Sequence, residues 1–260
     1  MTEPTAAALA GTGVPWPLAG SNRQPADRLG TAVVTTLVDL IVSGRYPAGA
    51  TLPTEAELGA QFGVSRTVVR ESVKLLQAKG LVNIRQGIGT VVSPDTSWNM
   101  IDDLVLRSLV QHDESLSILD ELVAVRAMLE RDTAAGAAEA RSSEHLARMR
   151  AALTEMEQAR DETAFSTADA AFHDAIMAAS GKRLARAIVT SIHDKARTTG
   201  RYQGEVSASH SKLTIEEHRR VLDAIENRDA TAAADAVYAH IVGSWARRRP
   251  RNDAAEQSES

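Results

Sequence analysis

The sequence predicts a mainly α-helical protein with an N-terminal winged helix-turn-helix domain and a C-terminal all-α helical bundle. Three observations support this fold class. Residues 54–92 read as two short helices that are joined by a tight turn and followed by a β-hairpin. The spacing of apolar residues beyond Pro94 is helical throughout. A chain of 260 residues is also long enough to build two compact cores.

The chain begins with residues 1–25, which are rich in Ala, Gly, Pro and Thr and show no apolar periodicity. We expect this segment to be a flexible arm. The winged domain is predicted over residues 26–95, and its first helix runs from about Asp27 to Ser43. Apolar residues recur at helical spacing through this stretch, and Gly44 is typical of a helix end.

Two helices with recognisable start signals follow. Thr54-Glu55-Ala56-Glu57 is a capping box, because the Thr oxygen can accept from an early helix N–H while Glu57 reaches back. The helix that it starts ends near Gly63. Ser65 is placed to cap the next helix, Arg66 to Lys79, which Gly80 ends. These proportions are those of a helix-turn-helix.

A predicted β-hairpin completes the winged domain. The β-prone runs 81–85 and 90–92 flank Gln86-Gly87-Ile88-Gly89, which has the glycines of a turn. Gly87 lacks a side chain, so the tip of this wing can approach a nucleic-acid backbone or minor groove closely.

The second domain is predicted over residues 96–250. Its helical pattern runs from about Ile101 to Arg248, with breaks near Asp113, Arg141, Asp161, Gly181, 200–209 and 227–229. We therefore expect an all-α bundle of six or seven helices. Residues 251–260 are expected to be a disordered tail.

The composition excludes several classes of protein. The chain has no cysteine, and no apolar run approaches the roughly 18 residues that a membrane-spanning helix needs. Its first residues lack the basic and apolar segments of a secretory signal. We expect a cytoplasmic protein without a membrane partner.

The charge is unevenly distributed. The net charge is -5, but residues 26–93 hold seven basic and five acidic side chains, a balance of +2. Because residues 1–25 are neutral, the remainder carries -7. This asymmetry is what a DNA-binding module joined to an acidic sensor domain would show.

The second helix of the helix-turn-helix carries a basic ridge. Arg66, Arg70 and Lys74 lie at i, i+4 and i+8, on the side opposite the apolar residues. An arginine near the start of a helix in the major groove can bind guanine, and Ser65 and Thr67 can hold phosphates. The alternative is an ordinary solvated face in which Arg70 pairs with a neighbouring glutamate, Glu71 or Glu57.

Residues 27–93 resemble the GntR family of bacterial regulators. The resemblance rests on the strings Leu52-Pro53-Thr54-Glu55-Ala56-Glu57-Leu58, Val64-Ser65-Arg66-Thr67-Val68-Val69-Arg70-Glu71, Leu76-Gln77-Ala78-Lys79-Gly80-Leu81-Val82 and Gln86-Gly87-Ile88-Gly89-Thr90-Val91-Val92. It implies base or phosphate contacts for Ser65, Arg66, Thr67 and Arg70, and contacts from the wing tip at Gln86 and Gly87. One departure is Ala56, where many members carry a DNA-contacting arginine.

Four residues of the second domain have the spacing of a metal site. Asp169 and His173 are four residues apart and share a helix face. His218 and His240 lie ten and twelve residues from a turn centred on Arg228, so they can face each other across antiparallel helices. One carboxylate and three imidazoles suit zinc, nickel or a similar divalent ion. For any single histidine, an ordinary packed residue is the more common outcome.

Residues 98–248 resemble the FCD effector domain, found in the fatty-acid-regulator-like GntR subfamily. The resemblance rests on Val125-Arg126-Ala127-Met128-Leu129-Glu130, Asp169-Ala170-Ala171-Phe172-His173, Glu216-Glu217-His218 and Tyr238-Ala239-His240. The resemblance supports the metal site, and it implies that residues 96–250 bind an effector and form the dimer. Arg126, in an apolar stripe, either binds an effector carboxylate or pairs internally with Glu130. His112, His145 and His210 are expected to be exposed, and His193 either lines the cavity or packs.

These expectations combine into one functional hypothesis. The chain is a dimeric DNA-binding transcriptional regulator, not an enzyme, and a small carboxylate or sugar acid releases it as a repressor from a pseudo-palindromic operator. Residues 97–103 are similar to the linker of FCD regulators that answer to sugar acids. The alternatives are a metal-dependent hydrolase and a metal-free sensor of acyl-CoA type.

Overall fold

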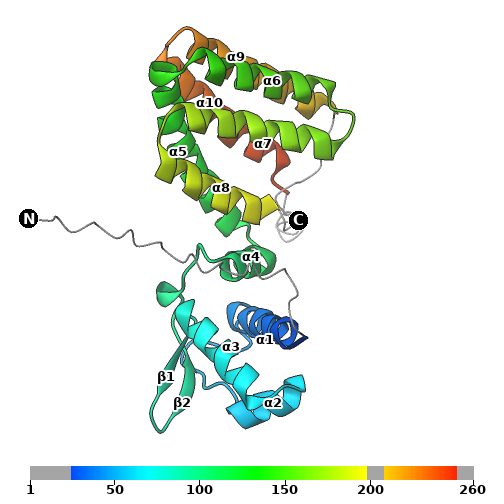
Figure 1. The fold of residues 1–260 in the computed structure, drawn as a ribbon, viewed down its shortest axis with the longest axis vertical. Coiled ribbons are helices and arrows are strands. Elements are labelled where there is room, and N and C mark those ends of the chain that lie inside the picture. The colour runs from blue at the N-terminus through cyan, green and yellow to red at the C-terminus, as the bar shows by residue number, and fades with distance from the viewer. Residues whose placement is uncertain (1–24, 198–207, 251–260) are drawn as a thin grey trace, which may run out of the picture.

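The computed structural model describes residues 25–197 and 208–250. Within them a winged unit, built from α1 to α3 and a hairpin, lies at one end of the molecule and a helical bundle at the other, with α4 between them (Figure 1). The mainly helical fold class with a winged helix-turn-helix and an all-α bundle is confirmed. Apart from Pro25, the predicted arm and tail lie outside the described residues.

The winged unit forms from the elements that the sequence signals. They are α1 (Pro25–Val42), α2 (Glu55–Phe62), α3 (Arg66–Ala78), β1 (Val82–Arg85) and β2 (Gly89–Val92). The capping box is present, because the Thr54 Oγ1 accepts from the Glu57 N–H and the Glu57 Oε2 accepts from the Thr54 N–H at 2.8 Å. The Ser65 Oγ caps α3 by accepting from the Val68 N–H.

The hairpin is antiparallel, and its register pairs Val82 with Val92 and Arg85 with Gly89. Thr51 adds a single bridge to Val91, which the sequence did not predict because one residue has no periodicity. The core of this unit lies between α1, α2, α3 and the strands, with Leu37, Leu58 and Leu76 almost completely buried. This packing holds α3 with its apolar side inward.

The bundle contains α5 (Ser117–Ala140), α6 (Ser143–Gln158), α7 (Glu162–Ala179), α8 (Arg183–Arg197), α9 (Ala208–Glu226) and α10 (Ala230–Arg248). The long helix α5 contacts α7, α8, α9 and α10, so it is the central support of the bundle. With α4 (Asp103–His112), the described part of the second domain has seven helices, as predicted. Most of its apolar core comes from residues three or four apart on each helix.

Helix α4 belongs to both cores. Val105 packs into the core of the winged unit, whereas Leu106 and Val110 pack into the bundle. The buried Ser108 donates to the Asp39 Oδ1 at 2.6 Å, which ties α4 to α1. A 3-10 turn at Asp95–Ser97 leads into this helix. The predicted boundary at residue 96 therefore falls just before an element that serves both units.

No helix of the described residues combines the length and the apolarity that crossing a bilayer requires.

Candidate functional site

Helices α7, α9 and α10 bring the four predicted ligands together. Asp169 and His173 come from α7, His218 from α9 and His240 from α10, and one ligand atom from each lies within 4.8 Å of the others. The Asp169 Oδ1 is 3.2 Å from the His218 Nε2. The His218 and His240 rings are 4.4 Å apart between centroids, so the two antiparallel helices place them at one height.

The Nδ1 atom of each of the three imidazoles contacts an oxygen acceptor, whereas its Nε2 faces the cluster. The Nδ1 of His173 contacts the Glu130 Oε2 at 2.5 Å, and that of His240 contacts the Glu217 Oε2 at 2.8 Å. The Nδ1 of His218 lies 2.7 Å from the backbone oxygen of Thr214. These acceptors favour the tautomer with the proton on Nδ1, which leaves each Nε2 lone pair for the centre of the cluster.

The charges of the site favour cation binding. Burial, reinforced by His218, lowers the pKa of His240 to about 3, so this imidazole is neutral at pH 7. Burial alone would raise the pKa of Asp169, but contact with His218 and the other imidazoles holds it well below its usual range. Likewise, burial opposes ionisation of Glu130, yet Arg126 and His173 lower its pKa strongly. The site thus combines a neutral His240 imidazole with ionised carboxylates.

The donor set fits a divalent metal ion. Among the described residues, the buried Nε2 atoms of His173 and His218 have no hydrogen-bond partner, although an unsatisfied buried nitrogen is costly. A metal ion between the four ligand atoms would satisfy them. Three imidazoles and one carboxylate, each oriented by a further acceptor, are typical of zinc and nickel sites.

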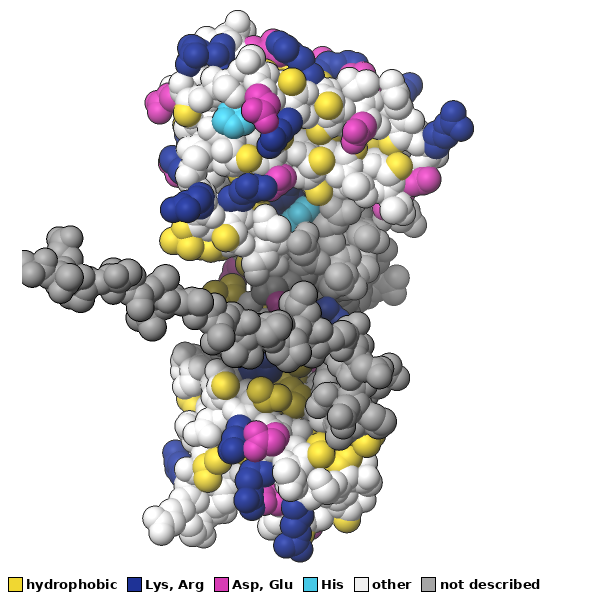
Figure 2. All heavy atoms as spheres, in the orientation of Figure 1, with side chains coloured by type: hydrophobic (Ala, Val, Ile, Leu, Met, Phe, Trp, Pro, Cys, Tyr) yellow, Lys and Arg dark blue, Asp and Glu magenta, His cyan; other side chains and the backbone are white. Residues whose placement is uncertain are grey.

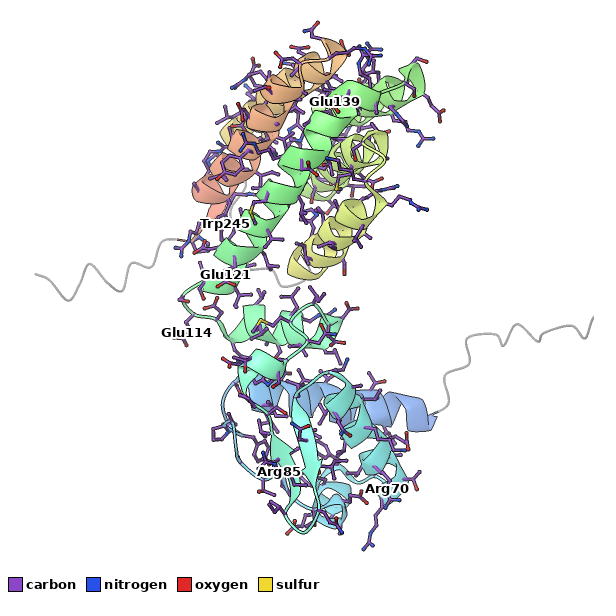
Figure 3. The ribbon with its side chains drawn as sticks, turned by 90° about the vertical axis from the view of Figure 1, so that its left-hand side faces the viewer. Arg70, Arg85, Glu114, Glu121, Glu139 and Trp245 are labelled. Carbon is purple, nitrogen blue, oxygen red and sulfur yellow. The ribbon has the colours of Figure 1, made fainter. Side chains whose placement is uncertain are left out.

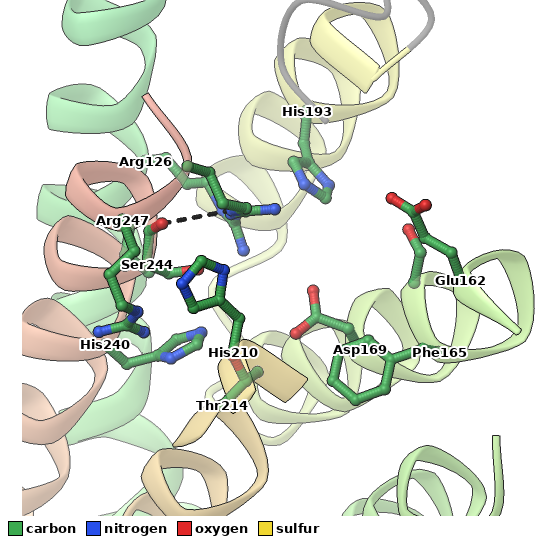
Figure 4. A pocket seen from close by; sticks show the side chains of 13 residues that line it. Arg126, Glu162, Phe165, Asp169, His193, His210, Thr214, His240, Ser244 and Arg247 are labelled. Carbon is green, nitrogen blue, oxygen red and sulfur yellow. Dashed lines mark hydrogen bonds between the residues drawn. The ribbon is translucent and has the colours of Figure 1, made fainter. Parts of the chain in front are cut away.

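A cavity opens beside the cluster (Figure 4). Its volume is about 60 Å³, and Asp169 and His240 face into it together with His193, His210 and Thr214. A ligand in this cavity would therefore meet the proposed metal ion directly.

Arg126 forms the internal ion pair that is one of its two predicted roles. It is 5% exposed, and its Nε donates to the Glu130 Oε1 at 2.5 Å. It also lines the cavity (Figure 4).

Sequence reasoning missed several residues of this site. Glu217 had no predicted role, although it precedes His218 and accepts from both His240 and Arg247. His210 was expected to be exposed, but it is half-buried and lines the cavity, because α9 begins at the cavity wall. No periodic signal distinguishes these residues; only the packing of separate helices does.

The predicted DNA-contacting residues lie on the surface of the winged unit. Every one of them is exposed: Ser65, Arg66, Thr67, Arg70, Gln86 and Gly87. Arg70 extends outward from the end of the unit that lies away from the bundle (Figure 3). It forms an ion pair with Glu55 at 3.0 Å, rather than with Glu57 or Glu71. Glu71 instead pairs with Lys74.

The wing carries exposed basic and apolar side chains in addition to the predicted DNA-contacting residues Gln86 and Gly87. Arg85 lies on the wing and is exposed (Figure 3), and Ile84 and Ile88 flank the turn with 57% and 59% of their surface exposed. Gly87 has a φ of 76°, a conformation that favours glycine. In the face of the molecule shown in Figure 2, basic side chains of this unit lie interleaved with acidic ones. This face of the winged unit therefore carries mixed charge.

Comparisons with known proteins give the family. Residues 29–92 match the model of the bacterial regulatory proteins of the gntR family, and residues 121–243 match the FCD domain. The galactonate operon transcriptional repressor of Escherichia coli K12 is 32% identical over 216 residues, which cover 83% of this chain and 94% of that protein. The chain belongs to the GntR family.

Other relatives span similar lengths. The HTH-type transcriptional regulator LutR of Bacillus subtilis is 30% identical over a stretch that covers 78% of this chain and 93% of that protein. The repressor NanR of Cronobacter sakazakii is 28% identical, with 84% and 85% covered. The solved structure of Lar, which controls expression of the Listeria monocytogenes agr system, has a TM-score of 0.53 at 17% identity and covers 83% of this chain and 94% of that chain. That similarity concerns the fold.

Family membership decides the class of function. The protein is a transcriptional regulator that binds operator DNA through its GntR domain and is not an enzyme, as predicted. The alternative of a metal-dependent hydrolase is therefore set aside.

Proposed function

We propose that this GntR regulator is a repressor that leaves its operator when a small carboxylate or sugar acid binds at a divalent metal site. The observation that carries the proposal is the convergence of Asp169, His173, His218 and His240 with each Nδ1 anchored from behind. Relatives named as repressors, one of a galactonate operon, support the direction of regulation and the class of effector.

The ion, zinc or nickel, would supply a Lewis-acidic position to which an effector carboxylate coordinates. Arg126 lies at the same cavity and would neutralise part of the ligand's charge. Because its Nε is engaged by Glu130, the guanidinium is held in one orientation. The effector would thus meet a site that is formed in advance.

A metal-free sensor of acyl-CoA type fits these residues less well. The cavity of about 60 Å³ is small, and three arginines, two carboxylates and three histidines line it. A fatty acyl chain would bury apolar surface against charged groups, which is unfavourable. A small polar acid matches both the size and the lining.

Operator contacts are proposed for the six exposed residues of α3 and the wing. Arg66 and Arg70 would bind base edges from the major groove, while Ser65 and Thr67 hold phosphates. Gln86 and Gly87 would contact DNA from the wing tip. Glu55 must release Arg70 when DNA binds, because its carboxylate competes with the phosphates for the same guanidinium.

The repressor is proposed to act as a homodimer through the outer face of α5 and α10. Val125, Met128, Tyr238 and Val242 are between 38% and 60% exposed on these two helices, which is unusual for large apolar side chains. Arg131 pairs with Asp235 and lies over the Tyr238 ring, so charged groups border the patch. A twofold axis would place this surface, defined as the α5/α10 face, against its own copy.

The dimer surface has a direct test in the full-length protein. Met128→Glu should shift the protein from dimer to monomer in sedimentation velocity, because it places two carboxylates in an apolar contact. Leu184→Glu is the matched control, since Leu184 is 75% exposed but lies on α8. A Met128→Glu protein that remains a dimer would refute the choice of face.

The metal sensor is tested by metal content and operator response together. Protein purified without chelators should contain about one divalent ion per chain, and His218→Ala should lower that content and make operator binding insensitive to effector. His145→Ala is the control, because His145 caps α6 away from the cluster. A metal-free wild-type protein, or a His218→Ala variant that responds normally, would overturn the mechanism.

A further inference from the structure

The cavity beside the metal cluster has two walls of opposite charge. Helices α5 and α10 contribute Arg126 and Arg247 to one wall, whereas α7 contributes Asp169 and Glu162 to the other (Figure 4). Arg248 also lines the cavity. Asp169 belongs to the metal cluster. Glu162, an exposed residue in the first turn of α7, belongs neither to that cluster nor to the partners that orient its histidines.

Glu162 is aligned with the metal ligands along α7. It is the first residue of the helix, and Asp161 caps it by accepting from the Ala164 N–H at 2.8 Å. Glu162, Ser166, Asp169 and His173 follow at spacings of four, three and four residues, so they lie on one stripe of the helix. The seven residues from Glu162 to Asp169 correspond to about 10 Å along the axis.

That separation matches the length of a six-carbon acid. Its extended chain of five bonds spans about 6 Å. A metal–oxygen bond at one end adds about 2 Å, and a hydrogen bond at the other adds about 2.8 Å. A ligand whose carboxylate coordinates the ion can therefore place its last carbon against Glu162.

The charge balance of the cavity favours a ligand with one negative charge. Three arginines line it, and they are opposed by Glu162 and Asp169 in the wall and by Glu130 and Glu217, which pair with Arg126 and Arg247. An imidazole that binds a metal ion through its lone pair is uncharged, so a divalent ion brings this set of described arginines and carboxylates to one net positive charge. A monocarboxylate neutralises it, whereas a dicarboxylate would bring its second charge to Glu162.

We infer that Glu162 selects a hydroxylated monocarboxylate of about six carbons and rejects the corresponding dicarboxylate. Its carboxylate accepts a hydrogen bond from the terminal hydroxyl of the first and repels the terminal carboxylate of the second. This inference rests on the proposed metal-site function and specifies which acids that site binds.

Two pairs of acids test the selection, because the members of each pair differ only in the last carbon. Zinc-loaded full-length protein would be titrated by calorimetry with galactonate and galactarate, and with gluconate and glucarate. At least one monocarboxylate should bind about tenfold or more tightly than its dicarboxylate partner. In Glu162→Gln the dicarboxylate should gain about tenfold in affinity, while the monocarboxylate changes by only a few fold. Glu155→Gln, on α6 and outside the cavity, should behave as wild type.

The possible failures are distinguishable. A wild-type protein that binds dicarboxylates as tightly as monocarboxylates, or a Glu162→Gln variant that keeps the discrimination, overturns the role of Glu162. A protein that holds zinc but binds none of the four acids overturns the ligand class and leaves the metal-sensor proposal in place. A protein that holds no divalent metal overturns both.

Discussion

At the scale of single residues, the unusual feature is that the side chains behind the metal ligands are themselves held by cations. Glu130 lies between His173 and Arg126, and Glu217 lies between His240 and Arg247. Each carboxylate therefore stays ionised although it is largely buried, and it can polarise the imidazole that it contacts. The arginines would thus influence the proposed metal site without contacting its four ligands.

Glu217→Gln should weaken zinc binding by about ten- to a hundredfold, because a neutral amide is a poorer acceptor for the His240 Nδ1–H than a carboxylate. The overall fold should persist, since the amide keeps the size of the side chain. Competition with a chromophoric chelator measures this change. Glu216→Gln is the matched control, because Glu216 is exposed and pairs only weakly with Arg219 at 3.6 Å. Equal zinc affinity in both variants would exclude this role for Glu217.

At the scale of elements, the proposed DNA contacts involve α3 and, through the ion pair between Arg70 and Glu55, the start of α2. Arg66→Ala and Arg70→Ala should each weaken operator binding by about tenfold or more, the cost of a lost bidentate base contact. Fluorescence anisotropy at fixed salt measures it, and Arg148→Ala on α6 controls for the loss of one positive charge. Unchanged affinity in both variants would show that α3 is not the recognition helix.

Replacing Glu55 should change operator affinity in the opposite direction to replacing Arg66 or Arg70. Glu55→Gln should tighten operator binding by a few fold, because it removes a negative charge near the phosphates and the partner that competes for Arg70. The gain should shrink as salt is raised. If Glu55→Gln instead weakens binding, the ion pair positions Arg70 for DNA rather than competing with it.

Helix α4 contributes side chains to both cores, so a substitution on it can destabilise one core at a time. Val105→Ala should destabilise the winged unit and Val110→Ala the bundle, each by about 1 to 2 kcal/mol, the loss expected for two buried methyl groups. Hydrogen–deuterium exchange should rise in α1 for the first variant and in α5 for the second. Faster exchange in the same unit for both variants would contradict the division.

At the scale of the whole molecule, the bundle is closed by contacts between its first and last long helices. Asp120, near the start of α5, accepts from the Trp245 Nε1 at 2.6 Å and pairs with Arg249 at 2.9 Å. The hydrogen bond from Arg249 lowers the pKa of Asp120 against the opposing effect of partial burial. These contacts join residues that are more than one hundred positions apart.

Because the pKa of Asp120 is lowered in the folded protein, its contribution to stability depends on pH. Its contribution to stability is complete above the unfolded pKa of about 3.9 and is lost as the pH falls through the lower folded value. Asp120→Asn should therefore destabilise the protein at pH 7 by less than about 1 kcal/mol, since the pair is partly solvated. The difference from wild type should vanish in acid. Thermal unfolding at several pH values measures it, with the exposed Glu144→Gln as control.

Much of this protein follows from local sequence signals. The capping box at Thr54, the Ser65 cap, the hairpin and the helix breaks of the bundle each depend on residues a few positions apart, so their patterns are readable without a structure. The four-residue metal cluster was predictable for a related reason. Asp169 and His173 share one helix face, and a single turn relates His218 to His240.

Only the tertiary structure determined which distant residues contact the helices and the cluster that these signals predict. Glu130 reaches His173 from 43 positions away, and Glu217 reaches His240 from 23, so neither contact follows a helical or strand period. The division of α4 between two cores and the charged walls of the cavity likewise depend on how α5, α7 and α10 pack. Local patterns fix which face of a helix is apolar, but not which neighbour meets that face. The chain by itself therefore determined the elements and the four residues of the Asp/His cluster, and packing determined the partners that contact those residues.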